Sequence, residues 1–173
     1  MVRNQQEIEE IKKSGQICAL ALLKSLEEVK PGVTTLELDR VAENEIRRLG
    51  GKPSFKTVEG YNFTICSTVE DQVVHTPPSE RVLKEGEIIS IDLGALWQGF
   101  HTDMARTVGV GKISEDKEKF IEVGFAAWKE SFKKALQDSK VKPYLVDCGE
   151  SVMTGYDKKS SAVSDPVNFT PRI

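Results

Sequence analysis

Two aspartates near the middle of the chain, Asp92 and Asp103, have a spacing that could hold two carboxylates side by side. The segment Trp97-Gln98-Gly99 lies between them, and a two-residue turn at Trp97-Gln98 predicts a hairpin in which Asp92 faces Asp103 directly. Their Cβ atoms would then be about 5 Å apart, and the like charges would destabilise the sheet by up to roughly 1 kcal/mol. Something is therefore expected to offset this repulsion.

Two interpretations of the carboxylate pair are open at this point. Both side chains could be solvated, or neutralised by Arg106 or Lys112, which is the commoner fate of surface aspartates. Alternatively, the pair could bind one or two divalent cations, because opposed hard oxygen ligands suit Mn, Fe, Co, Zn or Mg. The residue types alone favour the first interpretation.

The two faces of this hairpin differ in composition. The face of the aspartates would also carry Ser90, Ala105, Gly94 and His101, which are small except for the histidine. The opposite face would carry mainly apolar residues suited to a core, namely Ile89, Ile91, Leu93 and Ala95 with Phe100, Thr102 and Met104. We therefore predict one dry face and one roomy acidic face, provided that no bulge at Gly99 shifts the register.

Helices are predicted before and after this hairpin. Apolar residues at helical spacing indicate an amphipathic helix over residues 8–29, which Pro31-Gly32 ends. Thr34-Thr35-Leu36-Glu37 offers a capping box for a second helix that runs to Leu49. A third helix follows Ser114, and residues 53–75 are expected to form short strands or extended loops.

The composition is typical of a single-domain globular protein. The chain has 173 residues, 24 Lys plus Arg against 27 Asp plus Glu, and 39% hydrophobic residues. A net charge of −3 argues against a generic binder of nucleic acids or of membrane surfaces. Three widely spaced cysteines, Cys18, Cys66 and Cys148, indicate neither a disulfide framework nor a thiolate zinc site, so we expect a cytoplasmic protein.

The wider pattern around the aspartates resembles the first half of a type I methionine aminopeptidase. The resemblance runs from about residue 4 to about residue 139 and rests on three motifs in order: Val73-Val74-His75-Thr76-Pro77-Pro78, Ile91-Asp92-Leu93-Gly94, and Gly99-Phe100-His101-Thr102-Asp103 with Arg106-Thr107. It implies an α+β fold of the pita-bread (creatinase/aminopeptidase-like) type, of which residues 1–139 would form the first αβ half. An antiparallel sheet flanked by helices is therefore expected.

The resemblance also implies roles for particular residues. Asp92 and Asp103 would bind two divalent metal ions (Co, Mn, Fe or Zn), with Asp103 bridging both. His75 would hydrogen-bond the scissile amide of a peptide or nascent protein N-terminus, although a lone histidine is more often structural. The implied methionine pocket and its surroundings comprise Tyr61, Cys66, Phe55 and, behind the metal ligands, His101.

The chain departs from the family pattern in two places. Thr76 stands where the family usually has Gly, which would restrict the backbone beside His75. In the family, a second half brings one further His and two Glu ligands, whereas residues 140–173 contain no His and only Glu150. We therefore expect a divergent and poorly ordered tail, weak or absent hydrolysis by this chain alone, and self-association through the uncovered half-fold. A truncation or frame change after about residue 139 would explain the tail.

Two other functions stay open. Relatives of this fold also serve as peptide- or protein-binding modules without metals, and such a module would be indifferent to chelators. A proline dipeptidase of the same fold is less favoured, because the lead-in before the first helix is short.

Overall fold

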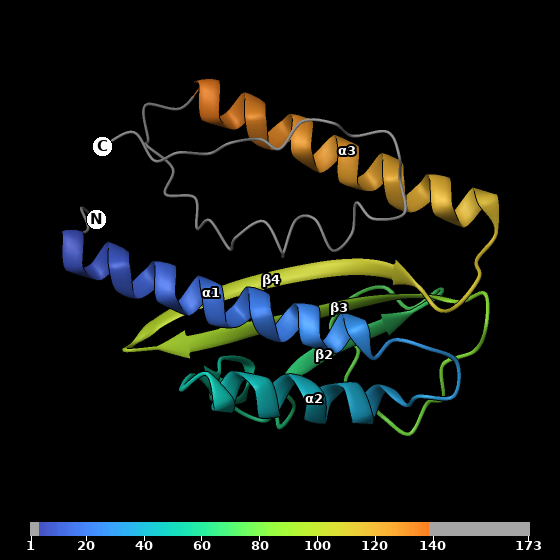
Figure 1. Cartoon of the computed structure of the whole chain (residues 1–173), viewed down its shortest axis with the longest axis horizontal. Coiled ribbons are helices and arrows are strands. Elements are labelled where there is room, and N and C mark those ends of the chain that lie inside the picture. Colours follow the sequence, from blue (N-terminus) through green and yellow to red (C-terminus); the bar gives the residue numbers. More distant parts are fainter. Residues whose placement is uncertain (1–3, 139–173) are drawn as a thin grey trace.

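The computed structural model describes residues 4–138, and Figure 1 shows their arrangement. The elements in chain order are α1 (Gln5–Glu27), α2 (Thr35–Arg48), β1 (Lys52–Pro53), the 3-10 turn η1 (Phe55–Thr57), β2 (Ile65–Val69), β3 (Ile88–Trp97), β4 (Phe100–Gly109) and α3 (Glu115–Asp138). The predicted tail, residues 140–173, lies outside the described residues. The division at residue 139 therefore stays a prediction.

Capping boxes start the first two helices. Thr34 Oγ1 accepts from the backbone N of Glu37 at 3.1 Å, and the Glu37 carboxylate accepts from the backbone N of Thr34 at 2.7 Å, as predicted. Asn4 and Glu7 form the same reciprocal pair at the start of α1, which the sequence analysis did not predict. These side chains satisfy amides that have no partner within the helix.

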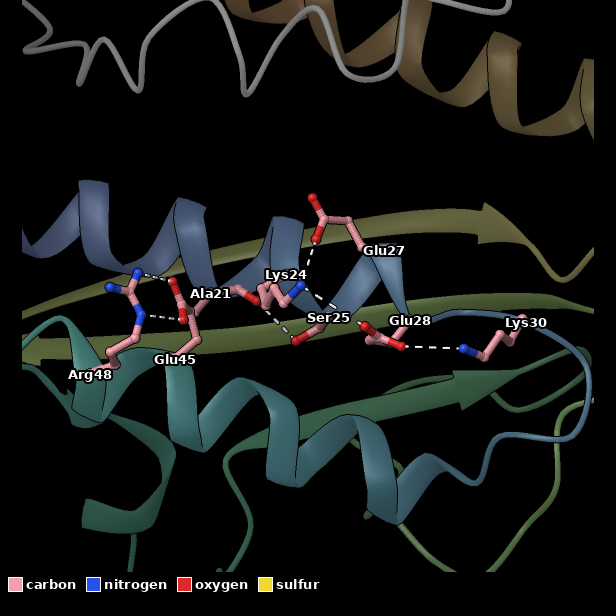
Figure 2. Close-up of polar contacts among 8 residues, drawn as sticks. All are labelled: Ala21, Lys24, Ser25, Glu27, Glu28, Lys30, Glu45 and Arg48. Carbon is pink, nitrogen blue, oxygen red and sulfur yellow. Dashed lines mark hydrogen bonds and ion pairs between the residues drawn. The ribbon is translucent and has the colours of Figure 1, made fainter.

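Ion pairs line the helix surfaces, and in each pair at least one side chain is exposed. Figure 2 shows Lys24 between Glu27 and Glu28 on α1, and Arg48 held by Glu45 within α2. Such pairs contribute little to stability, typically below about 1 kcal/mol each. The fold therefore depends on what the opposite helix surfaces bury.

The sheet is antiparallel and centres on β3. The strand β4 pairs with one edge of β3, whereas β2 and the short β1 pair in succession with its other edge. Helices α1 and α2 lie side by side over one face (Figure 1). That face carries the predicted apolar residues Ile89, Ile91, Leu93 and Ala95, which are fully buried against side chains such as Ile17 and Leu38. The α+β class and the dry face are confirmed.

Ser14 fixes α1 against the turn end of the hairpin. Its Oγ is buried and lies 3.2 Å from the carbonyl oxygen of Ala95, 3.0 Å from that of Phe100 and 3.0 Å from Thr102 Oγ1. One turn earlier, the Glu10 carboxylate accepts from Trp97 Nε1 at 2.7 Å. These directional contacts set the position of the helix along the strands, which apolar packing alone does not.

The hairpin turn lies one residue later than predicted. Gln98 and Gly99 both have positive φ, 47° and 84°, so they form the turn, and Trp97 pairs with Phe100. Such a turn matches the right-handed twist of the strands. The predicted direct pairing of Asp92 with Asp103 is therefore wrong. A turn shifted by one residue changes the pairing by two, which preserves the face on which each side chain lies.

None of the helices described between residues 4 and 138 is long and apolar enough to cross a membrane. Neither Cys18 nor Cys66 forms a disulfide bond among the described residues.

Gly94 lies where another segment crosses the sheet. A Cβ at this position would meet Ser54 Cβ at 2.8 Å, the carbonyl oxygen of Thr102 at 2.9 Å and Phe55 Cε1 at 3.0 Å. We expect Gly94→Ala to lower the free energy of unfolding by about 1 to 3 kcal/mol, because backbone and packed side chains must shift. Urea denaturation measures this.

The matched control is Gly124→Ala in the middle of α3, where a Cβ would meet nothing within 4 Å. This change should leave stability unaltered or raise it by up to about 1 kcal/mol, because Ala favours the helix. Equal effects of the two substitutions would contradict the close approach at Gly94.

Candidate functional site

The two aspartates lie diagonally on one face of the β3–β4 ladder. Asp92 pairs with Ala105, and Asp103 pairs with Gly94, so the two side chains are diagonal neighbours. Their carboxyls share a hydrogen bond. Asp92 is half-buried and Asp103 is exposed. Burial raises the pKa of Asp92 to about 7, and the hydrogen bond and the charge of Asp103 act in the same direction.

Arg106, one of the two cations considered above, lies on the other face of the ladder. Arg106 pairs across the ladder with Ile91 on the opposite face, and its guanidinium lies over the Phe125 ring, 4.2 Å from the centroid. The position of Arg106 on the ladder therefore does not support neutralisation of the aspartates by this residue.

A cluster of aromatic side chains adjoins the carboxylate pair. Cys66 on β2 is the direct partner of Asp92, and Tyr61 Oη lies 3.2 Å from Cys66 Sγ. The Tyr61 ring meets Phe55 and Phe63 edge-on, with centroids 6.4 and 5.8 Å apart. Burial raises the pKa of both the Tyr61 hydroxyl and the Cys66 thiol, so both stay neutral at pH 7. The structure thus brings the three predicted pocket residues together beside Asp92.

Ser54 and Phe63 also belong to this region, although the sequence analysis did not assign them to the site. Ser54 Oγ lies 2.6 Å from His101 Nδ1, which anchors a histidine on the face of the aspartates. Ser54 and Phe55 cross over Gly94, so the acidic face is filled there and not open as predicted. A small residue at Gly94 was the signal for this close approach.

His75 lies on the loop that runs along the edge of β2 that does not pair with β3. The carbonyl oxygen of the next residue, Thr76, accepts from the backbone N of Ser67 at 2.8 Å. His75 is exposed and has a left-handed φ of 55°, a conformation that is uncommon for residues other than Gly, although His adopts it more often than most, and that occurs at functional sites. No hydrogen bond of its side chain is found within residues 4–138, so no hydrogen bond there joins it to the aspartates.

The donor set around Asp92 and Asp103 fits a divalent cation in part. Two carboxylates in contact, one of them with a raised pKa, provide hard oxygen ligands for which a cation would replace the shared proton. However, no group of three or more His, Cys, Asp or Glu side chains gathers within residues 4–138. Any ion bound here would need further ligands from water or from other polypeptide.

Comparison with known proteins assigns the chain to a family. Metallopeptidase family M24 matches residues 9–155, so the chain belongs to this family. It is 41% identical to a methionine aminopeptidase of Clostridium perfringens over 152 residues, which are 88% of this chain and 59% of the relative. It is 39% identical to methionine aminopeptidase 1 of Bacillus subtilis over 88% of this chain and 60% of the relative. The chain thus spans about three fifths of these relatives, and the family match extends past residue 139.

Solved structures support the same assignment. A methionine aminopeptidase from Thermotoga maritima superposes with a TM-score of 0.72 at 31% identity, over 90% of this chain and 63% of that one. A prolidase from Pyrococcus furiosus gives a TM-score of 0.65 at 26% identity, over 74% and 36% of the two chains. The pita-bread fold is therefore confirmed.

The raised pKa of Asp92 predicts how stability depends on pH in the chelated protein. An unfolded aspartate titrates near about 3.9, so the folded state holds a proton that the unfolded state releases between about pH 4 and pH 7. Stability should therefore fall as pH rises through this window. In EDTA, Asp92→Asn should remove roughly 1 to 2 kcal/mol of this fall, a figure reduced because water screens a half-buried pair.

Denaturant midpoints measured from pH 4.5 to 7.5 check this expectation. Ser90→Ala is the matched control, because Ser90 lies on the same face and bonds Thr107 Oγ1 instead of a carboxylate. If Asp92→Asn and Ser90→Ala keep the same pH slope as the parent chain, the two carboxyls do not share a proton.

Proposed function

We propose that this chain supplies the first half of the active site of a dinuclear methionine aminopeptidase, which removes Met from the N-terminus of peptides or nascent proteins. The observation that carries the proposal is the contact between Asp92 and Asp103 directly beside the Tyr61–Cys66 pocket. Methionine aminopeptidases among the relatives support the choice of reaction.

In this proposal Asp92 and Asp103 would hold the divalent ions. Such ions, when bound, would acidify water and polarise a scissile carbonyl. Asp103, the more exposed of the two carboxylates, would be the more accessible ligand. His101, anchored by Ser54, lies two residues from Asp103 on the same face and would orient it or its waters.

The pocket residues fit a methionine side chain chemically. Tyr61, Phe55 and Cys66 present aromatic edges and a neutral thiol, which favour a polarisable thioether over a charged side chain. His75 would donate to or accept from the amide that is cleaved. Its exposed position at the edge of β2 leaves it accessible to a peptide.

The donor set present in residues 4–138 predicts weak metal binding by the chain itself. Titration with Mn²⁺ should show binding that Asp103→Asn and Asp92→Asn each weaken at least about 10-fold, because each removes one anionic ligand. Ser90→Ala should bind Mn²⁺ like the parent chain. The affinity can be followed by the electron paramagnetic resonance signal of free Mn²⁺.

Binding of Mn²⁺ that is unaffected by either aspartate change would contradict the proposed metal site. Peptide binding that is indifferent to chelator and to Asp103→Asn would instead favour the non-catalytic binding module.

Hydrolysis by this chain alone should be absent or very slow, because two carboxylates hold ions loosely without the further ligands of the family. Release of methionine from a Met-Ala-Ser peptide, with Co²⁺ or Mn²⁺ added, measures this. An ordinary turnover that Asp103→Asn does not abolish would be incompatible with the assigned roles. We further expect the chain to act in the cytoplasm and to self-associate through the uncovered face of the half-fold.

A further inference from the structure

Asp39 is a deeply buried carboxylate that the proposed metal chemistry does not use. It lies on α2, is 5% exposed, and points at the start of β2. A single oxygen, Oδ1, accepts from the backbone N of Thr64 at 2.7 Å and from that of Ile65 at 3.0 Å. Burial raises the pKa of Asp39 although both amides oppose the shift. An apolar residue here would leave these two buried amides without an acceptor, so the carboxylate has a specific structural role.

The other end of the same loop is also held by α2. Glu43, one helical turn after Asp39, pairs through Oε2 with Lys56 Nζ at 2.5 Å. The loop over residues 54–65 carries the aromatic rings of the proposed pocket, with Tyr61 and Phe63 between the two anchors and Phe55 directly before Lys56. Asp39 and Glu43 therefore bind the loop over residues 54–65, the pocket loop, near both of its ends. We name this pair of residues the α2 clamp.

The Asp39 contact is transmitted directly to the pocket. The carbonyl oxygen of Ile65, whose amide Asp39 holds, accepts from Tyr61 Oη at 2.7 Å. The next residue, Cys66, contacts the same hydroxyl and pairs with Asp92. A shift of this strand start would therefore move Tyr61 and Cys66 relative to the carboxylate pair.

We propose that Asp39 is a positioning residue for the methionine pocket, which acts by fixing the backbone of Thr64 and Ile65, with the Glu43–Lys56 pair as its weaker counterpart. The pocket's ligand, a methionine side chain, rests on the function proposed above. Asp39 itself touches neither substrate nor metal, and its effect passes through Tyr61 and Cys66.

The test follows the reactivity of Cys66 in the full chain. Iodoacetamide modifies a 6%-exposed thiol mainly when its surroundings open locally, so the rate reports how firmly the pocket loop is held. Peptide mass mapping separates Cys66 from Cys18 and Cys148. Cys18 is fully buried in the core and serves as an internal control for global opening.

Asp39→Ala should speed modification of Cys66 at least about 10-fold relative to Cys18, because two buried amides lose their acceptor. Asp39→Asn should restore the rate to within about 3-fold of the parent chain, since one amide oxygen can accept both bonds. Glu45→Gln is the matched control on α2, because Glu45 forms its ion pair with Arg48 of the same helix and not with a residue of the pocket loop (Figure 2).

Unchanged Cys66 reactivity in folded Asp39→Ala, or equal acceleration of Cys66 and Cys18, would overturn the positioning role. If Asp39→Ala does not fold, Lys56→Met provides the test, because it releases the other end of the pocket loop. This substitution should speed Cys66 modification a few-fold relative to that of Cys18. An unchanged rate of Cys66 modification would overturn the α2 clamp.

A second measurement separates this inference from the proposed function. L-methionine should slow Cys66 modification in the parent chain, and Asp39→Ala should require at least about 10-fold more methionine for the same protection. If methionine protects neither protein, the proposed methionine pocket is wrong. The rate of Cys66 modification without ligand still tests the positioning role of Asp39. If it protects both at the same concentration, Asp39 does not position the pocket.

Discussion

Contact between two carboxylates is the constraint on which the rest of this structure depends. Asp92 and Asp103 repel when both are ionised, and the fold nevertheless holds them together on one face with the pKa of Asp92 raised to about 7. Proteins tolerate such a feature when a proton or a cation compensates it. In this family, whose members are metallopeptidases, a cation is the natural partner.

The scaffold imposes this contact through packing on the other side of the sheet. Ile89, Ile91 and Leu93 are buried under α1 and α2, so alternation along β3 directs Asp92 to the opposite face. Ser14 and the Gln98-Gly99 turn then fix the longitudinal position of the hairpin. On the acidic side, Asp39 and Glu43 of α2 bind the loop that carries Tyr61 and so keep Tyr61 beside Cys66.

The sequence allowed the face of each aspartate to be predicted, but not their exact pairing. Face depends only on strand alternation, which survived the one-residue error in the turn, whereas pairing depends on which residues adopt positive φ. The capping box at Thr34 was predictable because it is local. The contact of Asp39 with Ile65 joins residues 26 positions apart, and that of Ser54 with His101 joins residues 47 positions apart. No local sequence pattern predicts such contacts. The resemblance to methionine aminopeptidases provided Tyr61 and Cys66, which periodicity alone would have left as core.

Carbon-13 NMR of the aspartate carboxyls, assigned with Asp92→Asn and Asp103→Asn, tests the central claim most directly. In metal-free protein the Asp92 carboxyl should keep its proton until about pH 7, and the signals of both carboxyls should move when Zn²⁺ is added. An Asp92 carboxyl that loses its proton near about pH 4, as an isolated aspartate does, with both signals indifferent to Zn²⁺, would contradict the account.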